Sequence, residues 1–183
     1  TAFDVELKNS KFIKEYAYIH KDSAAKNNVD IVGKDFMEFL DRYQQIVADA
    51  IAKYTFKDKP EELYEPMNYI ISHGGKRLRP IMVLMACDLF GGNLKEAIKP
   101  ALAIEFFHNF TLIHDDIMDE APVRRGKPTV HQKWNPSVAI LSGDALYIAA
   151  YQQLANYSDQ RLPLLLQRFN RFACVLNQVS QGL

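Results

Sequence analysis

Residues 110–131 read Phe-Thr-Leu-Ile-His-Asp-Asp-Ile-Met-Asp-Glu-Ala-Pro-Val-Arg-Arg-Gly-Lys-Pro-Thr-Val-His. An apolar helical run ends here in three aspartates, Asp115, Asp116 and Asp119, and two arginines follow, Arg124 and Arg125. On a helix, Asp115 and Asp119 share one face and lie one turn apart. Asp116 is rotated by about 100° from Asp115. The stretch therefore predicts a helix end with two carboxylates on one face and a third beside them.

These residue types suit a diphosphate site. Carboxylate oxygens favour hard cations such as Mg²⁺, which bind one or two carboxylates together with substrate phosphates. Asp115 and Asp119 are the predicted main ligands, and Asp116 could hold a second ion or a water at the rim of the site. The planar, permanently charged guanidinium groups of Arg124 and Arg125 suit phosphate oxygens.

The simpler interpretation of the acidic cluster is a solvated helix terminus. Two observations argue against it. The cluster lies at the C-terminal end of a helix, where the helix macrodipole disfavours negative charge. It also follows Ala101-Leu102-Ala103-Ile104-Glu105-Phe106-Phe107, which is apolar enough to be core. Because this placement costs stability, the cluster indicates function.

Composition limits the class of protein. The chain has 183 residues, of which 48% are hydrophobic, and 22 basic residues balance 22 acidic ones. One globular domain with a real core is expected, with no net charge to recruit nucleic acid or an anionic membrane. No apolar run is long enough to span a bilayer, and no signal peptide is evident. The two cysteines, Cys87 and Cys174, are expected to be buried free thiols in a cytoplasmic protein.

The apolar spacing predicts an all-α protein with no βαβ pattern and no internal repeat. Residues 121–133 are expected to form a polar loop. Residues 1–36 show only weak periodicity and are predicted as an N-terminal extension, separate from a main domain over 37–183. The predicted helices cover about 36–54, 61–72, 81–90, 94–119, 137–156 and 161–181.

A second basic stretch precedes the helix predicted over 81–90. Lys76 and Arg79 lie near a helix N-terminus, where backbone N–H groups favour anions. Gly74-Gly75-Lys76 is not a P-loop, because the spacing is wrong and no Ser or Thr follows the lysine. His108 lies two helical turns before Asp115 on the same face. Two roles are therefore open for His108: a functional residue of the site or a packed core residue.

Three motifs resemble the trans-isoprenyl diphosphate synthases, the family of farnesyl, geranylgeranyl and longer polyprenyl diphosphate synthases. They are Gly-Gly-Lys-Arg-Leu-Arg-Pro at 74–80, Leu-Ile-His-Asp-Asp-Ile-Met-Asp at 112–119 and Arg-Arg-Gly-Lys-Pro-Thr at 124–129. The resemblance implies an isoprenoid-synthase-type helical bundle around a central cavity. It also implies Mg²⁺-dependent condensation of isopentenyl diphosphate with an allylic diphosphate, by ionisation, condensation and elimination.

The resemblance also implies a role for each residue. Asp115 and Asp119, helped by Asp116, would bind Mg²⁺ that bridges the allylic diphosphate, and Arg124 would contact that diphosphate. The diphosphate of isopentenyl diphosphate would bind four residues: Lys76, Arg79, His108 and Arg125. Such enzymes are typically homodimers, so a homodimer is expected, without nucleic acid and without stable membrane insertion.

Side chains just before the first aspartate would limit the product length. Phe110 and Thr111 lie five and four residues before Asp115, and Phe107 or Phe106 lies one turn deeper. A bulky Phe110 at the floor of the pocket predicts a short product of about C15 to C20. The same aromatic residues are also compatible with an ordinary core.

One feature departs from the family pattern. The family has a second aspartate-rich motif on a later helix, and no acidic residue follows Asp159 here. The sequence is therefore expected to be the N-terminal part of a longer enzyme. Two alternatives remain: a non-catalytic regulatory subunit of a heteromeric prenyl synthase, or a terpene synthase. Lys76, Arg79 and His108 argue against the terpene synthase, because a cyclase needs no second diphosphate.

Overall fold

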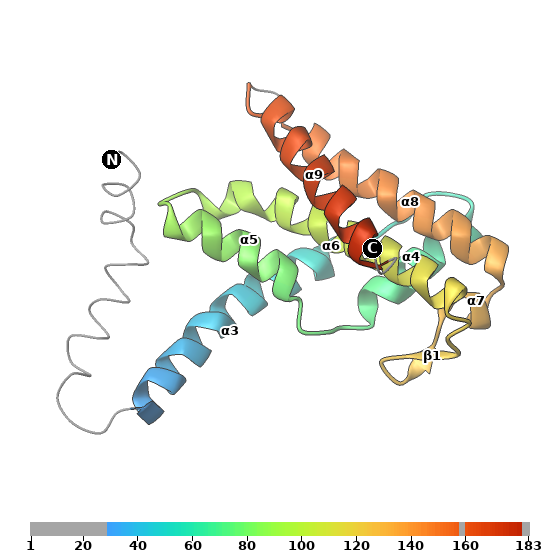
Figure 1. Cartoon of the computed structure of the whole chain (residues 1–183), viewed down its shortest axis with the longest axis horizontal. Helices are drawn as coiled ribbons and strands as arrows, with labels where there is room; N and C mark the ends of the chain where they lie inside the picture. The colour runs from blue at the N-terminus through green and yellow to red at the C-terminus, as the bar shows by residue number, and fades with distance from the viewer. Residues whose placement is uncertain (1–28, 158–159, 181–183) are drawn as a thin grey trace. The chain divides into compact units, whose positions relative to one another are not determined.

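The computed structural model describes residues 29–157 and 160–180, and its elements are almost all helices (Figure 1). They divide into two compact units. The first holds the described residues up to Ala50 together with Arg77–Ala101, and the second holds Ile51–Lys76 together with the described residues from Leu102 onward. The predicted all-α class is confirmed, and residues 1–28 of the predicted N-terminal extension lie outside the described residues.

The first unit contains most of α3 (Val29–Lys53), α5 (Leu78–Leu89) and the beginning of α6 (Leu94–Met118). Tyr43 of α3 is fully buried, and its hydroxyl donates a 2.5 Å hydrogen bond to Asp88 of α5. Helix α3 begins earlier than predicted, in line with an apolar spacing that continues before Phe36. Helix α5 also begins before the predicted residue 81. Its Pro80 lies in the first turn, where a missing N–H costs nothing.

The second unit contains α4 (Glu61–Ser72), the rest of α6, β1 (Val123–Arg124), β2 (Lys127–Pro128), α7 (Val130–Lys133), α8 (Pro136–Ala155) and α9 (Leu162–Ser180). Helix α8 packs against α4, α7 and α9 (Figure 1). Asn135 caps α8, accepting a 2.8 Å hydrogen bond from the amide of Val138. The buried core includes Met67, Ile70, Phe106, Phe107, Ile113, Ala139, Leu146, Ala150, Leu154 and Phe169.

Two of the sequence predictions are wrong in part. Residues 121–133 form a short hairpin and one helical turn in place of a continuous loop. The two cysteines are free, as predicted, but Cys174 is exposed and Cys87 is only partly buried. Cys174 lies five positions after the buried Phe169 on α9, which turns it away from the packed face.

Candidate functional site

The end of α6 fixes the aspartates on a defined backbone turn. The amide of Asp119 donates a 2.8 Å hydrogen bond to the carbonyl of Asp115, so the two residues lie one helical turn apart. Glu120 then adopts a left-handed conformation, with φ of 50°. The amides of Glu120 and Ala121 donate to the carbonyls of Ile117 and Asp116, which is the hydrogen-bond pattern of a Schellman motif. The two aspartates therefore share one face at the end of the helix.

The carboxylates at this helix end repel one another. Burial raises the pKa of Asp115 above its ordinary value, and the charge of Asp119 raises it further. Arg124 acts in the opposite direction, and Asp116 adds a smaller upward effect. A cation beside Asp115 and Asp119 would relieve this repulsion, so the donor set fits a hard divalent ion.

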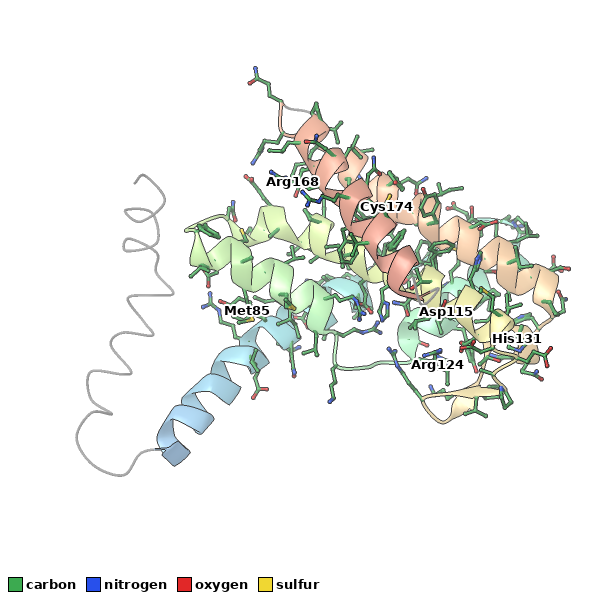
Figure 2. All side chains as sticks on the ribbon, viewed as in Figure 1. Met85, Asp115, Arg124, His131, Arg168 and Cys174 are labelled. Carbon is green, nitrogen blue, oxygen red and sulfur yellow. The ribbon has the colours of Figure 1, made fainter. Side chains whose placement is uncertain are left out.

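Asp116 is 1% exposed and is paired with Arg124 of β1. Figure 2 labels Arg124 and Asp115, the residue directly before Asp116. Arg124 Nε lies 2.8 and 2.9 Å from the two Asp116 oxygens, and Nη2 lies 2.7 Å from Oδ1. The hydrogen bond to Asp116 is the main cause that raises the pKa of Arg124. Asp116 is thus buried and does not lie at the rim, where the sequence placed it. The pair ties the hairpin to the end of α6.

The hairpin turns through two residues, Arg125 and Gly126, whose φ angles are 52° and 75°. Two consecutive residues with positive φ between paired strands form the type I′ geometry that suits tight hairpins. In the sequence, the signal for this turn was the pair Arg125-Gly126. Asn-Gly or Asp-Gly is the usual signal for a type I′ turn. Thr129 Oγ1 closes the base of the hairpin with a 2.8 Å hydrogen bond to the carbonyl of Ala121.

Arg125 reaches the loop that carries Lys76. Its Nη1 donates to the carbonyl of Gly74. A Cβ on Gly75, where φ is 117°, would lie 2.8 Å from the Arg125 Cζ, so only glycine allows this approach. The loop and the hairpin therefore meet at Gly74 and Gly75, the two residues directly before Lys76. Arg79 belongs to the first unit and lies exposed in the first turn of α5.

The other predicted residues lie on α6. His108 is half-buried, and its carbonyl accepts a 2.8 Å hydrogen bond from Thr111 Oγ1. Phe107 is fully buried and Phe110 is half-buried, with their ring centroids 5.5 Å apart. Both rings contact Tyr147 of α8, at 5.9 and 5.3 Å. An aromatic wall thus forms before the aspartates, and Tyr147 was not predicted as part of it.

Tyr69 of α4 is another residue that the sequence did not single out. Its hydroxyl donates a 2.9 Å hydrogen bond to the carbonyl of Pro128, and its ring contacts Trp134. The ammonium group of Lys133 lies over both rings, 3.9 Å from the Tyr69 centroid and 4.3 Å from the Trp134 centroid. These contacts hold the base of the hairpin on α4. A single tyrosine on an amphipathic helix carries no sequence signal for such a role.

Two negative findings apply to the described part of the chain. No three His, Cys, Asp or Glu side chains there are grouped so that they could hold a metal ion. Mg²⁺ is usually completed by substrate phosphates and water, so this finding is compatible with the two-carboxylate site predicted from Asp115 and Asp119. Among the same residues, no helix is both long and apolar enough to cross a membrane.

Comparisons with known proteins show the family of this chain. The family model described as Polyprenyl synthetase matches residues 60–182. The geranylgeranyl diphosphate synthase of Methanosarcina mazei is 47% identical over 107 residues, covering 58% of this chain and 33% of that protein. The geranylgeranyl diphosphate synthase of Sulfolobus acidocaldarius is 40% identical over 152 residues, covering 80% and 46%.

Solved structures agree as well. The crystal structure of geranylgeranyl pyrophosphate synthetase from Pyrococcus horikoshii has a TM-score of 0.71 at 35% identity, covering 81% of this chain and 46% of that one. The chain belongs to the polyprenyl synthetase family, and the predicted family and isoprenoid-synthase fold are confirmed. It spans less than half the length of these relatives.

Proposed function

We propose that this chain carries the first diphosphate site of a prenyltransferase that condenses isopentenyl diphosphate with an allylic diphosphate. The observation that carries the proposal is the end of α6. There Asp115 and Asp119 share one face, and their repulsion favours a bound cation. Family membership and relatives named geranylgeranyl diphosphate synthase support the same reaction.

The residues divide between two substrates. Asp115 and Asp119 would hold Mg²⁺ with the allylic diphosphate, with Asp116 acting through its pair with Arg124. When bound, Mg²⁺ supplies electrostatic stabilisation of the departing diphosphate. Arg124 has five N–H donors, and its contacts with Asp116 use only Nε and Nη2, so donors are left for an allylic phosphate. Lys76, Arg79, His108 and Arg125 would hold isopentenyl diphosphate.

The direct test is incorporation of labelled isopentenyl diphosphate by the full-length protein that contains this sequence. We expect an extended prenyl diphosphate when both substrates and Mg²⁺ are present, and none after chelation of the metal. Release of diphosphate from the allylic substrate alone, with a cyclised hydrocarbon as product, would favour a terpene synthase. Metal-dependent binding without any condensation would favour a regulatory subunit. The basic residues Lys76 and Arg79, together with His108, favour the synthase, because a cyclase needs no second diphosphate.

Replacing Lys76 with alanine is expected to raise the KM for isopentenyl diphosphate about tenfold or more, because a phosphate contact loses its cation. The KM for the allylic diphosphate should change by less than about twofold. Steady-state kinetics with each substrate varied in turn measures both values. Lys127→Ala is the matched control, since Lys127 is an exposed lysine of the hairpin with no assigned role. Equal rises in both KM values for Lys76→Ala would refute the two-site assignment.

Product length is proposed to depend on Phe110, Thr111 and Phe107, with a short product of about C15 to C20. The structure adds Tyr147, whose ring touches both phenylalanines from α8. Tyr147→Ala is expected to lengthen the products, because it opens the aromatic wall behind Phe110. Chromatographic sizing of the products measures this change. Tyr157→Ala, at the end of α8, is the control that should leave the distribution unchanged. An unchanged product distribution for Tyr147→Ala would exclude this wall as the limit on chain length.

Three further predictions concern the assembly and location of the protein. A homodimer is supported by exposed apolar residues on α8, where Leu141 and Ile148 are 59% and 57% exposed and lie two turns apart. Sedimentation velocity on the full-length protein tests it. The cytoplasmic location and the division into residues 1–36 and 37–183 also stay predictions.

A further inference from the structure

Three consecutive residues of α8 have not been used by the proposed reaction: Ser142, Gly143 and Asp144. The sequence favours close helix packing for this small-residue stretch, and it leaves open a supporting role behind the metal ligands for Asp144. In the structure Ser142 and Gly143 are buried, whereas the Asp144 side chain is 57% exposed. Each of the three contacts a neighbouring helix of the second unit, and two of them contact the same side chain.

That side chain is His114 of α6, the residue directly before Asp115. A Cβ added to Gly143 would lie 2.6 Å from His114 Nε2 and 2.7 Å from its Cδ2. Real Cβ atoms essentially never lie this close to another non-bonded heavy atom, so a side chain at position 143 must displace the imidazole. The His114 imidazole therefore occupies the space that a side chain at position 143 would need.

Polar contacts hold the imidazole in this space. His114 Nε2 lies 3.6 Å from Asp144 Oδ1 and 3.4 Å from the carbonyl of Ile140. The ring also packs edge-on against Phe110, with centroids 4.7 Å apart. Ser142, directly before Gly143 on α8, donates a 3.0 Å hydrogen bond from Oγ to the carbonyl of Leu63 on α4. Helix α8 is thus fixed to α4 and receives the His114 ring of α6.

We propose that Gly143 and Asp144 are positioning residues for the metal-binding end of α6: they seat the His114 side chain on α8 and thereby fix the turn that carries Asp115 and Asp119. This inference rests on the proposed function for its catalytic consequence. Its structural basis does not, because the contacts join residues of this chain to one another. A displaced imidazole has to be accommodated within the helical turn that carries Asp115, and small misplacements of reacting groups are costly.

The first experiment needs no substrate. In an exposed helix, Gly→Ala is stabilising, because glycine loses more conformational freedom on folding. Here we expect Gly143→Ala to lower the melting temperature of the metal-free protein. In a His114→Ala background the same substitution should raise it, because the nearest remaining side-chain atom, Ile113 Cγ2, lies 3.7 Å from the added Cβ, an ordinary contact distance. Equal shifts of the melting temperature in both backgrounds would refute the inference that the His114 imidazole occupies the space at Gly143.

The second experiment measures the catalytic consequence in the full-length protein. Gly143→Ala is expected to lower kcat about 10-fold to 100-fold and to raise the half-saturating Mg²⁺ concentration, with the KM for isopentenyl diphosphate nearly unchanged. A general loss of structure would instead move all three parameters. Asp144→Ala should act in the same direction and more weakly, and Asp144→Asn should retain more activity, because its amide oxygen keeps a polar atom beside His114 Nε2. The exposed Asp144 makes these variants usable even where Gly143→Ala folds poorly.

The outcomes separate this inference from the proposed function. Wild-type protein without Mg²⁺-dependent incorporation would refute the proposed function, and the melting-temperature reversal would still test the contact. Active wild-type protein whose Mg²⁺ requirement is unchanged by Gly143→Ala and Asp144→Ala would refute the inference alone. Calorimetric titration with Mg²⁺ and inorganic pyrophosphate provides a readout apart from turnover, with several-fold weaker binding expected for both variants.

Discussion

Replacing Asp115 with asparagine is expected to abolish Mg²⁺-dependent turnover and, at the same time, to stabilise the metal-free protein. A loss of about 10³-fold or more is expected for removal of a group that holds the charge-stabilising ion. The gain in stability follows from the electrostatics. Burial and Asp119 raise the pKa of the Asp115 carboxyl, so its charged form is disfavoured in the folded state.

The sign of the pH dependence follows from this shift. Because the folded-state pKa lies above the unfolded value, the stabilising effect of the protonated carboxyl is present below the unfolded pKa and is lost as pH rises through the folded pKa. Asp115→Asn should therefore raise the melting temperature at pH 7 and leave it nearly unchanged below about pH 3, where both proteins are neutral at this position. Mg²⁺ affinity of the wild type should fall on acidification earlier than for an ordinary aspartate.

Melting curves over a pH series, with and without Mg²⁺, measure both effects. Added Mg²⁺ should stabilise the wild type and leave Asp115→Asn unaffected. Glu120→Gln is the matched control, because it removes the same charge from the same helix end at an exposed position outside the proposed site. Retained Mg²⁺-dependent activity in Asp115→Asn would rule out a ligand role for Asp115.

Arg124→Ala is expected to lower the free energy of unfolding of the protein, even without substrates. Asp116 is 1% exposed, and the substitution would leave its carboxylate buried without its arginine. Breaking a buried ion pair costs about 3–5 kcal/mol, and the partial exposure of the Arg124 side chain, 28%, places the expected loss at roughly 2–3 kcal/mol. Urea denaturation measures this free energy of unfolding.

Two comparisons make the result specific. Asp116→Asn in the Arg124→Ala background should recover much of the loss, because it removes the unpaired charge. Arg125→Ala changes the adjacent, exposed arginine and should cost less than about 1 kcal/mol. If Arg124→Ala and Arg125→Ala are equally mild, the Asp116–Arg124 pair does not hold the hairpin on α6.

The helices were predictable because their signals are local. Pro60 and two glutamates open α4, two glycines follow its end, and Asn135 caps α8, so both helices were placed nearly as observed. The aspartates were predictable as a group because their spacing alone puts two of them on one face. The predicted start of a helix was wrong where the sequence signal was weak. Helix α3 begins at Val29, whereas the clear apolar spacing begins only at Phe36.

The partners of these residues were less predictable, because they depend on contacts between distant segments. Nothing near Asp116 in the sequence shows that Arg124 folds back to bury it. That contact depends on a hairpin whose turn uses Arg125 at positive φ, a conformation that arginine rarely adopts. From the sequence, Gly143 is likewise interpreted as a packing residue, and only the structure shows that it lies beside the His114 ring.

Calorimetric titration of the protein with inorganic pyrophosphate, with and without Mg²⁺, tests the proposed diphosphate site most directly. The site predicts binding that requires Mg²⁺ and is lost in Asp115→Asn, while Glu120→Gln binds like the wild type. Pyrophosphate binding of equal affinity without Mg²⁺, unchanged by Asp115→Asn, would contradict a metal–diphosphate site at the end of α6.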